Sequence, residues 1–155
     1  MNSRSPTSYA LLDRPRALLL ALALFALLGP ACGSSVKRKP TFPAFGKVLW
    51  QGQPARDAQV FFHPLDDTDT RNWPDGFPRG KVGADGMFQL GTQGEKDGAP
   101  AGNYVVIIIW PEASAKEEDE EPRDRLQGRY RDPRKSTIRR QITEGPNELE
   151  TIHLK

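Results

Sequence analysis

Cysteine and histidine are scarce in this chain. There is one cysteine, Cys32, and there are two histidines, His63 and His153. A single thiol cannot form an intramolecular disulfide. With so few thiols and imidazoles, neither the usual ligand sets of zinc nor a Cys–His catalytic pair can be assembled. The serines also lack a Gly-x-Ser-x-Gly context, and no glycine-rich phosphate loop precedes a helix. We therefore expect no catalytic residues, no metal site and no cofactor.

An excess of charge of one sign is also missing. The chain has 22 Lys and Arg residues and 20 Asp and Glu residues. Arg4, Arg14, Arg16 and Asp13 precede Cys32, which leaves 19 basic and 19 acidic residues from Cys32 onward. A formally neutral domain has no field that gathers phosphates, so nucleic acid is not an expected partner.

The only long apolar run spans residues 17–28, and it is too short to be a permanent membrane span. Arg14 and Arg16 precede it, and small residues and Cys32 follow it. A helix of this length rises about 18 Å, whereas the hydrocarbon core of a bilayer is about 30 Å thick. The order of basic residues, apolar run and small residues predicts a cleaved signal peptide over residues 1–31.

The end of this leader resembles a lipoprotein signal, in which the cysteine after the cleaved bond receives lipid. Cys32 is the predicted lipidation site. The match departs from the usual pattern because Leu28 lies one residue too far back, with Gly29 and Pro30 intervening. Cleavage without lipid and an uncleaved short anchor are the alternatives. Residues 32–44 combine Gly and Ser with Pro and three basic residues, which predicts a solvated tether.

The remaining residues, 45–155, predict an all-β domain: a seven-stranded antiparallel β-sandwich. Asp85-Gly86 between two strand-like runs is typical of a β-hairpin. Residues 103–110 are almost continuously apolar, which predicts a central strand that is buried on both faces or nearly so. The seven expected strands cover residues 46–51, 58–63, 80–82, 87–90, 103–110, 136–143 and 149–154.

Two segments between the expected strands are rich in acidic residues. Residues 65–79 are rich in Asp, Asn, Pro and Gly and predict a long surface loop. Its carboxylates, from Asp66, Asp67, Asp69 and Asp75, are candidate calcium ligands, and Trp73 is a candidate platform for a sugar ring. A solvated acidic loop is the simpler interpretation of the same residues. The acidic run at residues 117–121 predicts a second exposed excursion.

Six short motifs follow one another along residues 45–155. They are Gly46-x-Val48-x-x-x-Gly52-x-Pro54, Ala58-x-Val60-x-Phe62, Ala84-Asp85-Gly86-x-Phe88-x-Leu90, Asp97-Gly98-Ala99-Pro100-Ala101-Gly102-x-Tyr104-x-Val106, Tyr130-x-Asp132-Pro133-x-x-Ser136 and Gly145-x-Asn147-x-x-x-x-x-x-Leu154. In this order they resemble the carboxypeptidase regulatory-like domain, and most closely its small lipoprotein type that is abundant in planctomycete bacteria. The resemblance implies a transthyretin-like Greek-key sandwich without catalytic residues. We expect Phe62, Phe88, Tyr104 and Val106 to meet in the core of the sandwich.

Three functional hypotheses follow from the sequence. The first is a lipid-anchored, non-catalytic module on the extracytoplasmic side of a cell-envelope membrane, with a structural role or an envelope protein or glycan as partner. The second is a module that binds carbohydrate or calcium through residues 65–79. The third is a hydroxyisourate-hydrolase-like enzyme, which shares the transthyretin fold. The enzyme ends in Tyr-Arg-Gly-Ser, whereas here Tyr130 and its neighbours have the wrong order and place.

The lipidation of Cys32 is directly testable by intact-mass spectrometry of the protein recovered from its native membrane fraction. We expect a mass that begins at residue 32 and includes acyl chains, because the thiol is the alkylated nucleophile. The Cys32→Ala variant should lose the acyl mass. A soluble product that is cut elsewhere and carries no lipid would contradict the prediction.

Overall fold

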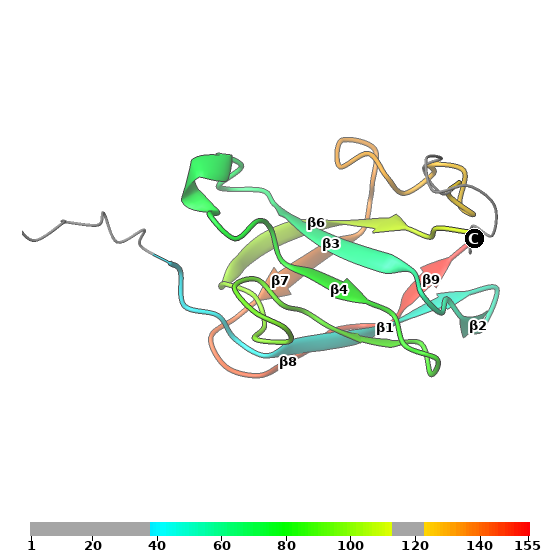
Figure 1. Ribbon diagram of the computed structural model, residues 1–155, viewed down its shortest axis with the longest axis horizontal. Helices are drawn as coiled ribbons and strands as arrows, with labels where there is room; N and C mark the ends of the chain where they lie inside the picture. The colour runs from blue at the N-terminus through cyan, green and yellow to red at the C-terminus, as the bar shows by residue number, and fades with distance from the viewer. Residues whose placement is uncertain (1–37, 113–122) are drawn as a thin grey trace, which may run out of the picture. The chain divides into compact units, whose positions relative to one another are not determined.

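The computed structural model describes residues 38–112 and 123–155, all within one compact unit of residues 36–155. The predicted leader, Cys32 and the acidic run at 117–121 lie outside the described residues. The described residues form an all-β domain of two sheets with one 3-10 helix, η1 (Thr70–Asn72) (Figure 1).

The first sheet is built around β1 (Ala44–Trp50), to which all its other strands pair. β5 (Met87–Gln89) and β2 (Gln53–Pro54) pair with β1 in antiparallel fashion. β8 (Asn147–Glu148) and β9 (Ile152–Leu154) pair with β1 in parallel fashion, β8 near its start and β9 near its end. The sheet is therefore mixed, and the expectation of a purely antiparallel sandwich is wrong for these two pairings.

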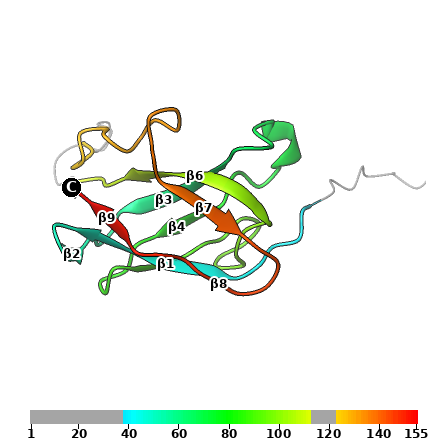
Figure 2. The ribbon, with the colours of Figure 1, turned by 180° about the vertical axis from the view of Figure 1, so that it is seen from behind.

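The second sheet is antiparallel and has the order β4-β3-β6-β7. Its strands are β4 (Arg79–Lys81), β3 (Gln59–Pro64), β6 (Gly102–Ile109) and β7 (Arg139–Ile142). The view from behind shows β7 beside β6 and the chain crossing from β7 to β8 in the other sheet (Figure 2). The predicted central position of residues 103–110 is confirmed, because β6 pairs with both β3 and β7.

Side chains of both sheets that face each other form the core between them. In β3, Val60 and Phe62 are fully buried, while Gln59 is exposed and Phe61 is half-buried. In β6, Tyr104, Val106 and Ile108 point into the core. The predicted aromatic core is confirmed: the ring of Phe62 lies 6.4 Å from that of Phe88 and 5.7 Å from that of Tyr104.

The Asp85-Gly86 turn is present, but its two arms enter different sheets. Gly86 has the expected positive φ of 83°, and the Gly83 amide donates to the Met87 carbonyl at 2.7 Å. Beyond that turn, β4 pairs with β3, whereas β5 pairs with β1. The arms are nevertheless joined as the sequence predicts, because Arg79 and Gly91 form an antiparallel bridge with N···O distances of 2.9 and 2.8 Å. The predicted hairpin is therefore present, although the longer ladders of its arms run to β3 and β1. A local turn signal specifies the reversal of the chain but not which strands receive the arms.

Strand number also differs from the expectation. The described residues contain nine strands rather than seven, because the short β2 and β8 flank the predicted strands. The expected closing strand at residues 149–154 is reduced to β9, and β1 begins at Ala44, one residue before the expected start of the domain. The Greek-key topology remains a prediction.

The turn between β7 and β8 is held by one buried amide, that of Asn147. Its Nδ2 donates to the carbonyls of Thr143, Gly145 and Pro43 at 3.0, 2.7 and 3.3 Å. Its Oδ1 accepts from the amide and the hydroxyl of Thr143 at 2.9 and 3.0 Å. One side chain thus fixes the crossing from the second sheet to the first.

Replacement of Asn147 by Ala should lower the free energy of unfolding by about 2 kcal/mol, because buried polar groups lose their partners. Chemical denaturation measures this change. The neighbouring Glu148 is exposed, and Glu148→Ala should change stability by no more than about 0.5 kcal/mol. Equal effects of the two substitutions would show that Asn147 does not fix this turn.

Candidate functional site

The residues just before β1 are docked on the domain and do not form a free tether. We call residues 38–43 the strap. The Arg38 guanidinium donates to both carboxylate oxygens of Asp75, at 2.8 and 3.2 Å. Lys39 Nζ lies 2.5 Å from Asp67 Oδ2 and 3.9 Å from the centroid of the Trp73 ring. The strap therefore places its two cations on the loop of residues 65–79.

Backbone contacts continue this docking toward β1. Phe42 and Ala99 form an antiparallel bridge, with N···O distances of 2.9 and 3.0 Å in the two directions. Gly98 makes the approach possible, because it has φ +93° and a Cβ at this position would lie 1.9 Å from the Phe42 carbonyl oxygen. The strap is therefore held both by ion pairs and by main-chain hydrogen bonds.

Trp73 fastens the loop of residues 65–79 to the core. Its side chain is only 6% exposed, its Nε1 donates to the Asp67 carbonyl at 2.8 Å, and its ring packs edge-on against Phe77 and Tyr104. Trp73 therefore does not offer its face to a sugar ring, and the prediction of a stacking platform there is corrected. The loop buries its one tryptophan because the indole is its largest apolar group.

Two other carboxylates of this loop, those of Asp69 and Asp66, bind residues outside the strap. Asp69 caps η1 by accepting from the Arg71 amide at 3.0 Å, and it also pairs with the Arg71 guanidinium. Asp66 accepts from Asn103 Nδ2 at 3.3 Å. With Asp67 and Asp75 bound to the strap, all four predicted calcium ligands have partners within this chain. In residues 38–112 and 123–155, no three His, Cys, Asp or Glu residues are grouped as a metal site requires.

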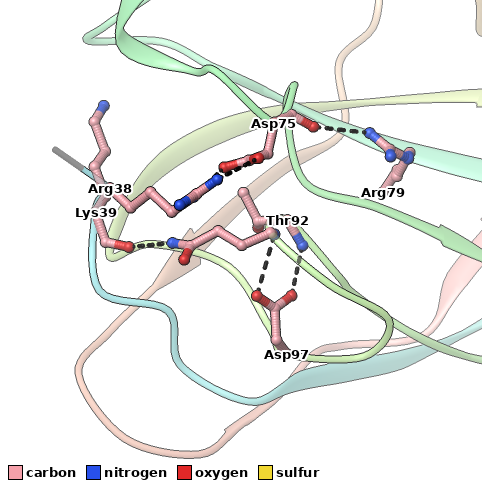
Figure 3. Close-up of polar contacts among 7 residues, drawn as sticks. Arg38, Lys39, Asp75, Arg79, Thr92 and Asp97 are labelled. Carbon is pink, nitrogen blue, oxygen red and sulfur yellow. Dashed lines mark hydrogen bonds and ion pairs between the residues drawn. The ribbon is translucent and has the colours of Figure 1, made fainter. Parts of the chain in front are cut away.

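Opposite this loop, residues 91–98 form a turn closed by Asp97. The Asp97 carboxylate accepts from the amides of Thr92 and Gln93, at 2.7 and 3.1 Å (Figure 3). The Thr92 hydroxyl donates to the Gly98 carbonyl at 2.7 Å. Gln93 Nε2 donates to the Lys39 carbonyl, so this turn also contacts the strap.

A groove of about 680 Å³ lies between Asp75, β4 and this turn. Arg79 stands at its wall and donates to the Asp75 carbonyl at 3.3 Å (Figure 3). Two glycines keep the walls close together, since a Cβ on Gly80 would lie 2.6 Å from the Gln89 carbonyl oxygen and one on Gly91 2.3 Å from that of Gly94. The lining residues are Asp75, Arg79, Gly80, Lys81, Gln89, Gly91, Thr92, Gln93, Gly94, Glu95 and Lys96.

The groove is lined by side chains that donate and accept hydrogen bonds. Its side chains are amides, carboxylates and cations, and the hydroxyl of Thr92 is already committed to a backbone carbonyl. No histidine lines it: His63 is in β3 beside Phe77, and His153 is in β9 of the other sheet. The hypothesis of a hydroxyisourate-hydrolase-like enzyme relied on Tyr130. Its hydroxyl accepts a hydrogen bond from the Lys155 amide at 3.1 Å.

The electrostatics of the strap follow from its ion pairs. The hydrogen bond from Arg38 holds the pKa of Asp75 below its usual value, and the one from Lys39 does the same for the pKa of Asp67. Both groups are solvent-accessible, so each pair is expected to contribute modestly and to weaken with salt. The sequence did not reveal these pairs, although a basic tether and an acidic loop are complementary in charge.

Comparisons with known proteins assign no family. No protein-family model and no curated protein matches the sequence. Among solved structures, a 9R-lipoxygenase from Cyanothece PCC8801 aligns with 90% of this chain at 15% identity and a TM-score of 0.39. The aligned region is 20% of the lipoxygenase chain, so this chain spans about a fifth of that protein. A likeness this weak carries no argument about function.

Acid should release the first residues of the strap. Because the pKa values of Asp67 and Asp75 are lowered in the folded state, the stabilisation is complete above about pH 4 and is lost as the pH falls through the lowered values. We expect the NMR signal of the Trp73 indole N–H to shift in that range, since Lys39 leaves its ring.

A double variant, Asp67→Asn with Asp75→Asn, provides the control for this titration. Its Trp73 signal should resemble the acid form already at pH 7. If the wild-type signal stays constant down to pH 2.5, backbone contacts alone hold the strap.

Proposed function

We propose that this chain is a lipid-anchored, non-catalytic module of the cell envelope, held at one end of its β-sandwich and free to contact a partner with the rest. The observation that carries the proposal is the docking of the strap. Arg38 and Lys39 bind Asp75 and Asp67, so the domain is fixed to the chain immediately downstream of the predicted lipid.

The segment between Cys32 and the strap is short, so docking of the strap limits how far the domain can lie from the predicted lipid. Five residues, 33–37, separate Cys32 from Arg38. A chain segment spans at most about 3.6 Å per residue, so Arg38 lies within about 22 Å of a lipidated Cys32. The strap, η1 and the groove would then face the membrane, and the end with β2, β9 and the C-terminal residue would face away from it.

Within the described residues no helix has the length and apolar character needed to cross a bilayer. The carboxypeptidase regulatory-like family remains our proposal for the fold family. It is supported by the buried positions of its motif residues, among which Phe62, Phe88 and Tyr104 form the aromatic core.

The proposed orientation is testable by energy transfer from the protein to the membrane. Because Cys32 is the only native cysteine, an added cysteine can be labelled selectively once Cys32 carries lipid. Thr68→Cys places a fluorophore beside η1, and Gln53→Cys places one in β2 at the opposite end; both residues are exposed. In vesicles with acceptor-labelled headgroups, transfer from position 68 should exceed transfer from position 53.

The strap variant Asp67→Asn with Asp75→Asn should reduce the difference between the two positions, since the domain is then held less rigidly. Equal transfer from positions 53 and 68 in the unaltered strap background would overturn the proposed orientation. A variant without Cys32 that folds normally but does not bind vesicles would show that the lipid on Cys32 attaches the protein to the membrane.

A further inference from the structure

A second pocket, of about 200 Å³, lies at the end of the sandwich opposite the strap. It is found where β1 ends, next to the C-terminal residue that follows β9 (Figures 1 and 2). We call it the distal pocket. Its lining residues are Trp50, Gln51, Arg125, Leu126, Gln127, Arg129 and Lys155.

Cations outnumber anions at the distal pocket. The side chains of Arg125, Arg129 and Lys155 line it, against one anion, the main-chain carboxylate of the C-terminal Lys155, and none of its described lining side chains is acidic. The nearest acidic side chain along the chain, that of Asp124, accepts backbone hydrogen bonds from Trp110, Leu126 and Gly128 at 2.9, 3.1 and 2.9 Å. Asp124 therefore organises the backbone of this segment while the arginines remain at the pocket.

Two of these cations are positioned before any ligand arrives. The Arg125 guanidinium carbon lies 4.1 Å from the centroid of the Trp110 ring. Trp110 is itself fixed, because Nε1 donates to the Arg56 carbonyl at 2.8 Å and its ring meets Trp50 edge-on at 5.8 Å. Arg129 donates one N–H group, through Nη1, to the main-chain carboxylate of the C-terminal Lys155. Preorganised guanidinium groups favour bidentate binding of a carboxylate.

The two glutamines of the pocket are held in an unfavourable backbone conformation. Gln51 and Gln127 have φ values of 50° and 52°, and each precedes a glycine with positive φ, Gly52 or Gly128. Such turns prefer Asn, Asp or Gly at the first position, so Gln carries a conformational cost there. Strain of this kind is concentrated at functional sites. Both glutamines line the pocket, and each carries a side-chain amide.

From these observations we infer that the distal pocket binds a carboxylate-bearing saccharide, with one acidic sugar unit in the pocket. The arginines receive the carboxylate, the two amides receive hydroxyl groups, and the half-buried Trp50 offers apolar surface to the ring. A volume of 200 Å³ equals about seven waters of ~30 Å³ each, which accommodates one monosaccharide unit. The inference does not depend on the lipid anchor.

Calorimetric titration of the full-length protein with trigalacturonate tests the inference, with the fully methyl-esterified trimer as the matched neutral ligand. We expect trigalacturonate to bind and the ester to bind at least tenfold more weakly, because the ester removes the charge that the arginines recognise. Binding should weaken between 50 and 300 mM NaCl. Absence of binding, or equal binding of the ester, would overturn the inference.

Three variants connect the binding to these residues. Arg125→Gln should lower the association constant about tenfold. Gln127→Asn relieves the unfavourable turn, so it should leave the melting temperature unchanged or higher while lowering the association constant severalfold. Arg131→Gln replaces an exposed arginine outside the lining and should leave affinity within twofold. If Gln127→Asn retains full affinity, the strained amide has no part in binding.

A tripeptide with a blocked N-terminus and a free C-terminal carboxylate distinguishes the two sources of this chemistry. We expect it to bind much more weakly than trigalacturonate, since it lacks the hydroxyl groups that the amides receive. If it binds as tightly, and with the same loss in Arg125→Gln, the pocket is a site for peptide carboxylates and the saccharide assignment is wrong.

Discussion

The structure depends on the pairing of β1 with four other strands. β5 and β2 join it in antiparallel fashion, and β8 and β9 in parallel fashion, so segments from the beginning, middle and end of the described chain meet on one strand. β1 also connects the two regions of interest. The strap enters at its first residue, and its last residue, Trp50, lines the distal pocket. At about 3.3 Å per residue, its length separates these regions by roughly 20 Å.

The two ends of the sandwich differ in how far their charged groups are paired within the chain. At the strap, both cations, Arg38 and Lys39, meet carboxylates of the 65–79 loop, so these charges are satisfied within the chain. At the distal pocket, Asp124 is directed to backbone amides, and the pocket keeps a surplus of positive charge. This difference explains why a chain that is formally neutral from Cys32 onward can still have a local preference for an anion.

The docking of the strap bears on the anchor that we propose. Ion pairs at the surface stabilise little, but together with the Phe42–Ala99 bridge they hold the strap on the domain. If Cys32 carries lipid, the domain would be attached at its strap end, and the distal pocket would lie away from the attachment. The anion that we propose for that pocket would meet an Arg125 guanidinium already stacked on Trp110, so its binding would cost less conformational freedom.

The sequence by itself determined the properties that depend on short stretches of chain. The β-branched and aromatic residues at 58–63 and the apolar run at 103–110 predicted two strands correctly, because the composition of a strand is a local property. The expected core residues Phe62, Phe88 and Tyr104 do pack together. Only the tertiary structure decided the sheet partners, since Asp85-Gly86 reverses the chain but long-range pairing selects β3 for one arm and β1 for the other. The tertiary structure also determined which residues the loop of residues 65–79 contacts. Trp73 lies near Lys39 and Tyr104 only after the strap and β6 pack together, and the distal pocket likewise requires residues 50, 125 and 155 to meet. Sites of this kind are contacts between distant segments, and no local pattern in the sequence encodes them.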